Sequence, residues 1–224
     1  MRVNYRKWLA EYVGTFALVF VGTGAIIVNQ ESNGMITHAG VSITFGAIVM
    51  GMILVFSKAS GAHLNPAVSC AFFISGSLPA RQFLLYAASQ FLGALSASLS
   101  LRLLFPLNPS LGVTQPSISP MQTIALEFFL TFLLMAVILK VAEKRESSLL
   151  ANSFIIGLVI ALEALLAGPL TGASMNPARS FGPALVSGHM EHLWIYLVPT
   201  TLGAVGAVLL WKLVGSRFKT ALQA

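Results

Sequence analysis

The sequence predicts an all-α membrane protein in which six transmembrane helices and two re-entrant half-helices form two inverted repeats. The first observation is composition: 56% of the 224 residues are hydrophobic and 9% are charged, whereas soluble domains carry about 25% charged residues. The second is a set of six apolar runs of about the length, ~20 residues, that a helix needs to cross a bilayer. The third is a tripeptide, Asn-Pro-Ala, that occurs once in each half of the chain.

The first half contains three predicted transmembrane helices and one short helix. Its long apolar runs cover residues 8–28, 37–56 and 82–104. Between the second and third runs lie a loop of small residues at 58–64 and a short helix predicted over 66–76. About 11 residues are too few to cross a bilayer, so this helix is expected to enter and leave on one side.

The segment 105–120 is the predicted linker between the two repeats. It contains four prolines and no charged residue. Because proline cannot donate a backbone hydrogen bond to a helix or a central strand, this linker is expected to be irregular.

The second half repeats the pattern. Transmembrane helices are predicted over residues 121–141, 149–167 and 192–214, and a short helix over 177–187 follows the loop 172–175. The dipeptide Gly168-Pro169 is expected to end the middle helix, because proline disrupts the helical hydrogen-bond ladder.

Individual residues recur at matching places in the two halves. The matching pairs include Glu11 and Glu127, Thr15 and Thr131, and Gly93 and Gly203. Each half crosses the membrane three times, an odd number, so the second half enters from the opposite side and the repeats are inverted. The whole chain, 1–224, is therefore predicted to be a single transmembrane domain with repeats at about 1–104 and 121–224.

The basic residues predict the orientation of the chain. Nearly all of them fall on one side of the predicted membrane: Arg2, Arg6, Lys7, Lys58, Arg81, Lys140, Lys144, Arg145, Lys212, Arg217 and Lys219. Only Arg102 and Arg179 fall on the other. By the positive-inside rule, both termini of this multi-pass protein are expected to be cytoplasmic, with the cell membrane as its location.

The Asn-Pro-Ala boxes predict where the two short helices begin. Asn is a preferred N-cap residue, and Pro fits the first helical position. The boxes comprise Asn65, Pro66, Ala67, Asn176, Pro177 and Ala178. Two interrupted segments at matching positions of two halves are typical of a membrane permeation site.

The loops before the boxes are predicted to line a pore with their backbone. Irregular backbone at membrane depth is tolerated only where it is buried in protein or lines a water-filled cavity. The residues concerned are Gly61, Ala62, His63, Leu64, Gly172, Ser174 and Met175. The ring of His63 is expected to pack, whereas His38, His189 and His192, near helix ends, are expected to be solvated.

Ionisable groups inside the apolar runs need a role, because they are costly in a membrane. The symmetric carboxylates Glu11 and Glu127 raise the idea of a proton relay, but their placement favours a structural role: accepting backbone N–H groups of the two loops. Glu163 has no counterpart in the first half and is expected either in the pore or behind the second loop. Arg179 either reaches the outer interface or lines the pore, and burying it costs ~2.5 kcal/mol at least.

Nearly the whole chain resembles the major intrinsic protein family, the aquaporins and aquaglyceroporins. The resemblance rests on Glu11-x-x-x-Thr15-Phe16, both boxes, Arg179 after the second box and the three-plus-three repeat. The stretch 167–175, with Trp194-x-Tyr196, is more similar to the nodulin-26-like branch and its bacterial relatives. The resemblance implies an aquaporin-like fold, a homotetramer in the lipid bilayer with one pore per subunit, and no cofactor.

The resemblance also implies a selectivity filter made of Phe45, Ala164, Ala173 and Arg179. Strict water channels typically have His at the position of Ala164, so its loss should widen the filter and leave an apolar wall. The residue after Arg179 is Ser180, where glycerol facilitators usually have Asp, and this departs from the glycerol-specific pattern.

These features predict a passive channel for water and small uncharged solutes, with protons and ions excluded by the boxes and Arg179. The solutes expected are glycerol and neutral metalloid acids such as boric or arsenous acid. A strict water channel is the alternative; a gradient-coupled transporter and a junction protein with little conductance are further ones.

Other classes of function find no support in the sequence. The basic residues lie at the ends of apolar runs and form no patch of the kind that binds nucleic acid. No histidines stand at metal-ligand spacing, and no residues form a catalytic constellation. We therefore expect neither an enzyme nor a bound metal.

Overall fold

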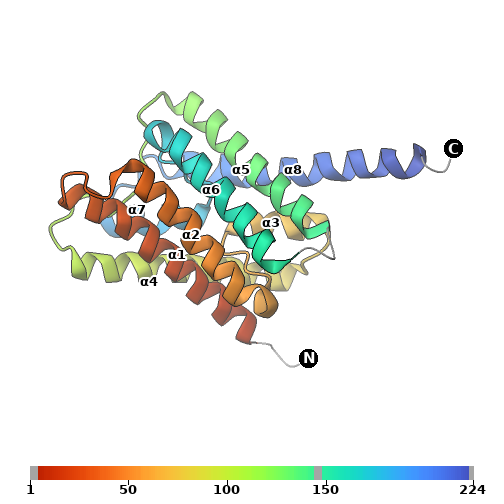
Figure 1. The fold of residues 1–224 in the computed structure, drawn as a ribbon, viewed down its shortest axis with the longest axis horizontal. Helices are drawn as coiled ribbons and strands as arrows, with labels where there is room; N and C mark the ends of the chain where they lie inside the picture. The colour runs from red at the N-terminus through yellow and green to blue at the C-terminus, as the bar shows by residue number, and fades with distance from the viewer. Residues whose placement is uncertain (1–4, 144–147, 222–224) are drawn as a thin grey trace.

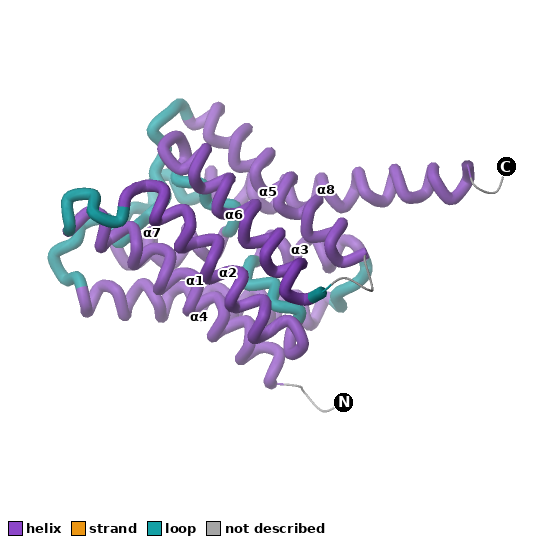
Figure 2. The backbone as a smooth tube through the Cα atoms, viewed as in Figure 1, coloured by secondary structure: helices purple, strands orange, loops and turns teal. Residues whose placement is uncertain are grey.

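The computed structural model describes residues 5–143 and 148–221, with side chains up to residue 214. These residues form eight helices joined by loops, and no strand is present among them (Figures 1 and 2). In chain order the helices are α1 (Tyr5–Glu31), α2 (Thr37–Ser60), α3 (Pro66–Ser75), α4 (Ala80–Leu104), α5 (Pro120–Glu143), α6 (Leu149–Thr171), α7 (Pro177–Ser187) and α8 (Trp194–Ala221).

Six of these described helices are long and apolar enough to cross a membrane, which agrees with the predicted spans. The two others, α3 and α7, are the predicted short helices. Much of each long helix remains exposed in the single chain, and the exposed residues are large and apolar, such as Phe129, Leu166 and Leu103. The end of α8 extends beyond the other helices (Figure 1). Of the basic residues used to predict orientation, Arg2, Lys144 and Arg145 and the side chains of Arg217 and Lys219 lie outside the described residues.

The helix contacts repeat between the halves. Helix α1 packs against α4 as α5 packs against α8, and α2 packs against α6 between the two sets. Each short helix packs against the last long helix of the other half, α3 against α8 and α7 against α4. The structure therefore has the pairing expected of a duplicated unit whose two copies exchange their short helices.

Glycines allow the closest helix crossings. A Cβ added at Gly93 would collide with the carbonyl oxygen of Tyr12, and a Cβ at Gly203 with that of Phe128. The same holds for Gly46 against Gly157 where α2 crosses α6. Small residues at helix interfaces let two backbones approach closely, which compensates for the absence of a hydrophobic driving force in lipid.

One expectation about a helix end needs correction, and the linker between the repeats is more than irregular. Helix α6 does not end at Ala167 but continues through Pro169 to Thr171. The segment between α4 and α5 is irregular, as predicted, but it is also built into the fold. Leu111 is fully buried, and the N–H of Ser117 donates to the carbonyl oxygen of Leu170 over 2.9 Å.

The crossing of α5 and α8 yields a testable prediction. Replacing Gly203 by Ala should lower the free energy of unfolding by about 1–3 kcal/mol, because the added methyl group overpacks the contact with Phe128. Gly206→Ala on the same helix is the matched control, since its Cβ would meet Phe128 at 3.4 Å, an ordinary contact. Thermal unfolding in detergent micelles measures the difference; equal stability of the two variants would contradict the prediction.

Candidate functional site

The site is built around two loops, each held by one buried glutamate. Glu11 of α1 accepts hydrogen bonds from the backbone N–H groups of His63 (2.9 Å) and Leu64 (2.7 Å). Glu127 of α5 accepts from those of Ser174 (2.9 Å) and Met175 (3.0 Å). Both carboxylates are completely buried. This is the placement that the sequence predicts for them.

The contacts around each glutamate are also duplicated. The hydroxyl of Ser60 donates to Glu11 (2.6 Å), as the hydroxyl of Thr171 does to Glu127 (2.8 Å). A tyrosine hydroxyl then donates over 2.7 Å to the carbonyl oxygen of each of these residues, Tyr86 to Ser60 and Tyr196 to Thr171. These polar side chains provide hydrogen-bond partners for backbone N–H and C=O groups of the two loops and of the residues just before them.

Both loops contain residues with left-handed backbone. In the first loop φ is 93° at Gly61, 49° at Ala62 and 53° at Leu64, and the second loop repeats the pattern at Gly172 (85°), Ala173 (42°) and Met175 (54°). Such conformations are unfavourable for residues other than glycine and persist only where the surroundings enforce them. The hydrogen bonds to the glutamates supply that constraint.

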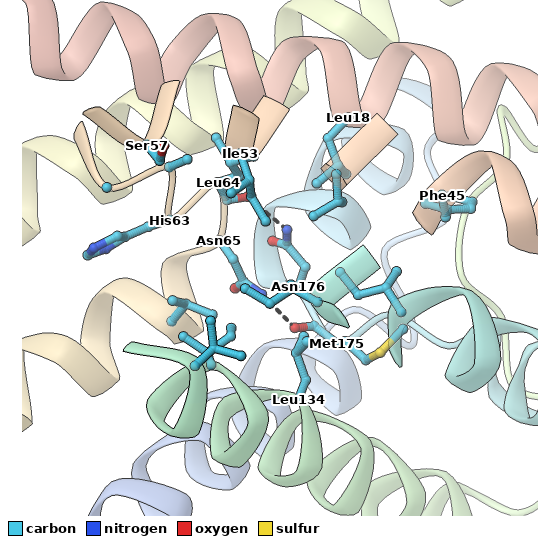
Figure 3. Close-up of a pocket in the computed structure, with 18 of the residues that line it drawn as sticks. Leu18, Phe45, Ile53, Ser57, His63, Leu64, Asn65, Leu134, Met175 and Asn176 are labelled. Atoms are coloured by element: carbon cyan, nitrogen blue, oxygen red, sulfur yellow. Dashed lines mark hydrogen bonds between the residues drawn. The ribbon is translucent and has the colours of Figure 1, made fainter. Parts of the chain in front are cut away.

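Asn65 and Asn176 each cap one short helix and contact the opposite loop. The side-chain oxygen of Asn65 accepts from the N–H of Ala67 (2.9 Å), and that of Asn176 from the N–H of Ala178 (3.0 Å). The amide nitrogens cross over: Nδ2 of Asn65 donates to Met175 O (2.8 Å) and Nδ2 of Asn176 to Leu64 O (2.9 Å), as Figure 3 shows. An amide has two N–H groups, so one N–H per Asn stays available for a molecule between the loops.

Two cavities meet at four side chains. The inner cavity, about 340 Å³, is lined by both loops and both Asn side chains. The outer cavity, about 300 Å³, is lined by residues of α1, α2, α6, the linker and the second loop, together with Arg179 of α7. The residues that line both are Phe45, Ala164, Ala173 and Arg179, the four expected from the resemblance. The predicted loop residues line these cavities as well, Gly172 the outer one and the rest the inner one.

Arg179 lies at this boundary and is 2% exposed. Its Nη1 donates to the carbonyl oxygen of Gly112 over 2.9 Å, and its guanidinium carbon lies 5.1 Å from the centre of the Phe45 ring. Its Nε has no hydrogen-bond partner among the described residues. That Nε atom is buried. A guanidinium has five N–H groups, so the Nη groups of a cation held by a backbone carbonyl and an aromatic face can still bind a neutral hydrogen-bond acceptor in the cavities that Arg179 lines.

The wall of the inner cavity is mostly apolar away from the loops. Its lining side chains include Leu18, Val49, Ile53, Val68, Phe72, Leu134, Ile138, Ile156 and Ile160. The cavity therefore offers polar groups along the two loops and carbon surface elsewhere. A small molecule with a hydroxyl-bearing side and a carbon side fits both surfaces.

Some residues play parts that the sequence analysis missed. His38 is exposed, as expected, but its Nε2 also lies 2.9 Å from Leu165 O and it lines the outer cavity. Gly112, in the linker, holds Arg179. The clue to the His38 contact in the sequence was Pro169: it has no N–H, so the carbonyl oxygen of Leu165, four positions earlier, needs a donor from elsewhere. The linker composition contains no clue to the Gly112 contact.

Two further polar residues, His63 and Glu163, differ in their relation to the cavities: His63 lines the inner one, whereas Glu163 lines neither. The ring of His63 stacks on Phe72 at 4.7 Å and its Nδ1 lies 3.1 Å from Ser69 Oγ, so it packs as expected. Glu163 is buried, lines neither cavity, and its carboxyl oxygens have no partner among the described residues. In the part of the chain that the structure describes, no group of three or more His, Cys, Asp or Glu could hold a metal ion.

The loop anchors yield a second prediction. Glu127→Gln should lower the free energy of unfolding by about 2 kcal/mol, because one acceptor oxygen becomes an NH₂ group that opposes a loop N–H. Water permeability should fall with it, since Ser174 and Met175 lose their anchor. Glu191→Gln, an exposed position between α7 and α8, is the control. Unfolding in detergent and osmotic shrinkage of proteoliposomes measure both effects; unchanged unfolding and permeability in Glu127→Gln would refute the anchoring role.

Comparisons with known proteins agree with this architecture. The family model of the major intrinsic proteins matches residues 2–211. The chain is 42% identical to putative aquaporin NIP4-1 of Arabidopsis thaliana and 43% identical to aquaporin NIP1-1 of Zea mays, over 210 residues that cover 93% of this chain and 74% of each relative. The solved structure of the aquaglyceroporin from Plasmodium falciparum superposes with a TM-score of 0.85 at 27% identity, covering 93% of this chain and 96% of that one. The chain therefore belongs to the major intrinsic protein family, whose members are multi-pass membrane proteins that act as passive channels for water and small solutes and not as enzymes.

Proposed function

We propose that this channel conducts water together with small uncharged solutes, namely glycerol and neutral metalloid acids such as boric and arsenous acid. The observation that carries the proposal is the boundary between the two cavities, where Ala164 and Ala173 accompany Arg179 and Phe45. Two methyl groups leave more width beside the guanidinium than an imidazole would. Arg179 and Phe45 then provide a donor for the hydroxyl groups and an apolar face for the carbon side of a solute.

The exclusion of protons and ions is assigned to the boxes and Arg179. Helices α3 and α7 begin at Asn65 and Asn176 next to the inner cavity, and each N-terminus carries roughly +0.5 charge from the helix dipole. A water between the loops accepts from the free N–H of each Asn and points its own hydrogens outward. This orientation interrupts a proton wire, and the positive ends of the dipoles repel cations.

A strict water channel is the second candidate. It is favoured by the Phe45 ring lying 5.1 Å from the Arg179 guanidinium, which narrows the opening from one side. A gradient-coupled transporter has less support, because the groups at the centre are amide N–H groups and helix N-termini, and no carboxylate lines either cavity among the described residues.

The assembly and orientation proposed are those of the resemblance: a homotetramer in the cell membrane, with one pore per subunit and both termini cytoplasmic. The basic side chains that fall on one side of the predicted topology support the orientation. The exposed apolar surface of the helices is available to lipid and to neighbouring subunits.

Solute flux tests the proposal directly. Proteoliposomes placed in hyperosmotic sucrose should shrink rapidly, and those in glycerol or boric acid should shrink and then re-swell faster than empty liposomes. The rates should not depend on a proton or sodium gradient. Stopped-flow light scattering measures them; re-swelling no faster than in empty liposomes would establish the strict water channel instead.

The role of Ala164 gives a further prediction. Ala164→His should reduce glycerol permeability about tenfold or more, because the ring fills space at the boundary of the cavities and a filter discriminates by such steric loss. Water permeability should change much less. Ala164→Ser, which adds polarity with little volume, separates the two effects and should retain most of the glycerol flux. Equal loss in both variants would show that width at position 164 does not set selectivity.

A further inference from the structure

Helix α6 has a gap in its ladder of backbone hydrogen bonds. In an α-helix the N–H of each residue donates to the carbonyl oxygen four positions earlier. Pro169 lies inside α6 and has no N–H. The carbonyl oxygen of Leu165 therefore loses its helical donor, one residue beyond Ala164 at the boundary of the two cavities.

His38 of α2 fills this gap. Its Nε2 lies 2.9 Å from Leu165 O. A carbonyl can only accept, so Nε2 carries the hydrogen in this bond. The bond joins α2 to α6 across 127 positions of sequence and replaces the missing bond within the helix.

Two local features fit the ring to this position. A Cβ added at Gly168 would lie 2.7 Å from Cε1 of His38, so a side chain there would displace the ring. The residue before His38, Thr37, has φ of 64°, which is unfavourable for a β-branched residue. Strained backbone of this kind concentrates at functional positions, where the surroundings enforce it.

The bond lies beside the proposed filter. His38 and Phe45 are seven residues apart on α2, about two helical turns, and so share one face of the helix. Leu165 follows Ala164 directly on α6. His38, Phe45 and Ala164 all line the outer cavity. The bond thus connects the two helices that carry opposite parts of the boundary, on its outer side.

We propose that His38 is a positioning residue for selectivity: its bond to Leu165 O sets the separation between Phe45 and Ala164. The proposal rests on the proposed conduction of neutral solutes. A solute such as glycerol contacts both walls and needs them at a fixed separation, whereas water needs only the donors of the loops and Arg179. Loss of the bond should therefore affect glycerol more than water.

A double-mutant cycle tests the proposal. His38→Phe keeps an aromatic ring but removes the donor, and it should lower the glycerol-to-water permeability ratio by about threefold or more. His38→Gln, which can donate from its amide, should retain much of the ratio. Pro169→Ala restores the N–H that α6 lacks, so the double variant His38→Phe/Pro169→Ala should return towards the ratio of Pro169→Ala alone. His192→Phe is the control for replacing a histidine near a helix end.

Thermal unfolding of the same variants provides a reading that does not depend on solute. His38→Phe should unfold at a lower temperature, and Pro169→Ala should remove most of that difference. If His38→Phe changes the permeability ratio and the unfolding temperature as much in the Pro169→Ala variant as in the wild type, His38 does not act through Leu165 O and the proposal is overturned. An unchanged ratio in His38→Phe alone overturns it too. If the wild-type protein passes no glycerol, the proposed function fails, while the unfolding cycle still decides whether the bond exists.

Discussion

The structure depends on one constraint: backbone that leaves helical geometry inside a membrane must still find partners for its N–H and C=O groups. An unsatisfied group costs several kcal/mol in hydrocarbon. Here two N–H groups of each loop donate to Glu11 or Glu127. One carbonyl oxygen of each loop accepts from Asn176 or Asn65 of the opposite loop. The glutamates lie behind the loops, so the cavity side retains groups that a passing molecule can bind.

This arrangement explains why the two halves need each other. The cross-loop bonds of the Asn side chains run from one half to the other in both directions, and each short helix packs against the last long helix of the opposite half. Neither loop could satisfy its carbonyl at the centre alone. The site therefore forms only when the halves pack, and close packing in turn requires glycine at crossings such as Gly93 and Gly203.

Arg179, the cation at the boundary of the cavities, is subject to the same constraint. A buried guanidinium is tolerated when it is paired or hydrogen-bonded. Arg179 donates to the carbonyl oxygen of Gly112 and lies over the face of the Phe45 ring. The linker thereby completes the site, and the boundary combines a charge with small alanine side chains that leave space beside it. The contacts that stabilise the buried guanidinium are thus the ones that would select the solute.

Much of this molecule could be predicted from sequence because its determinants are local or periodic. The lengths of the apolar runs predict the spans, and the Asn-Pro pairs predict where α3 and α7 begin. The recurrence of Glu11 as Glu127 predicts that both carboxylates serve equivalent loops. The family resemblance adds the four residues at the boundary of the cavities. Hydropathy and capping preference depend on neighbouring residues, and a repeat is visible when the two halves of the sequence are compared.

Tertiary structure alone decided the contacts between residues far apart in the chain. The proline predicts that α6 ends at Ala167, yet the helix continues through Pro169 to Thr171, and the donor near the freed carbonyl of Leu165 is His38 of α2, 127 positions away. Likewise, nothing in the linker composition singles out Gly112 as the partner of Arg179, and the crossed bonds of Asn65 and Asn176 require both loops in place. Sequence determined which groups had to be satisfied in the membrane; packing determined which partners satisfy them, since that depends on distances that no local pattern encodes.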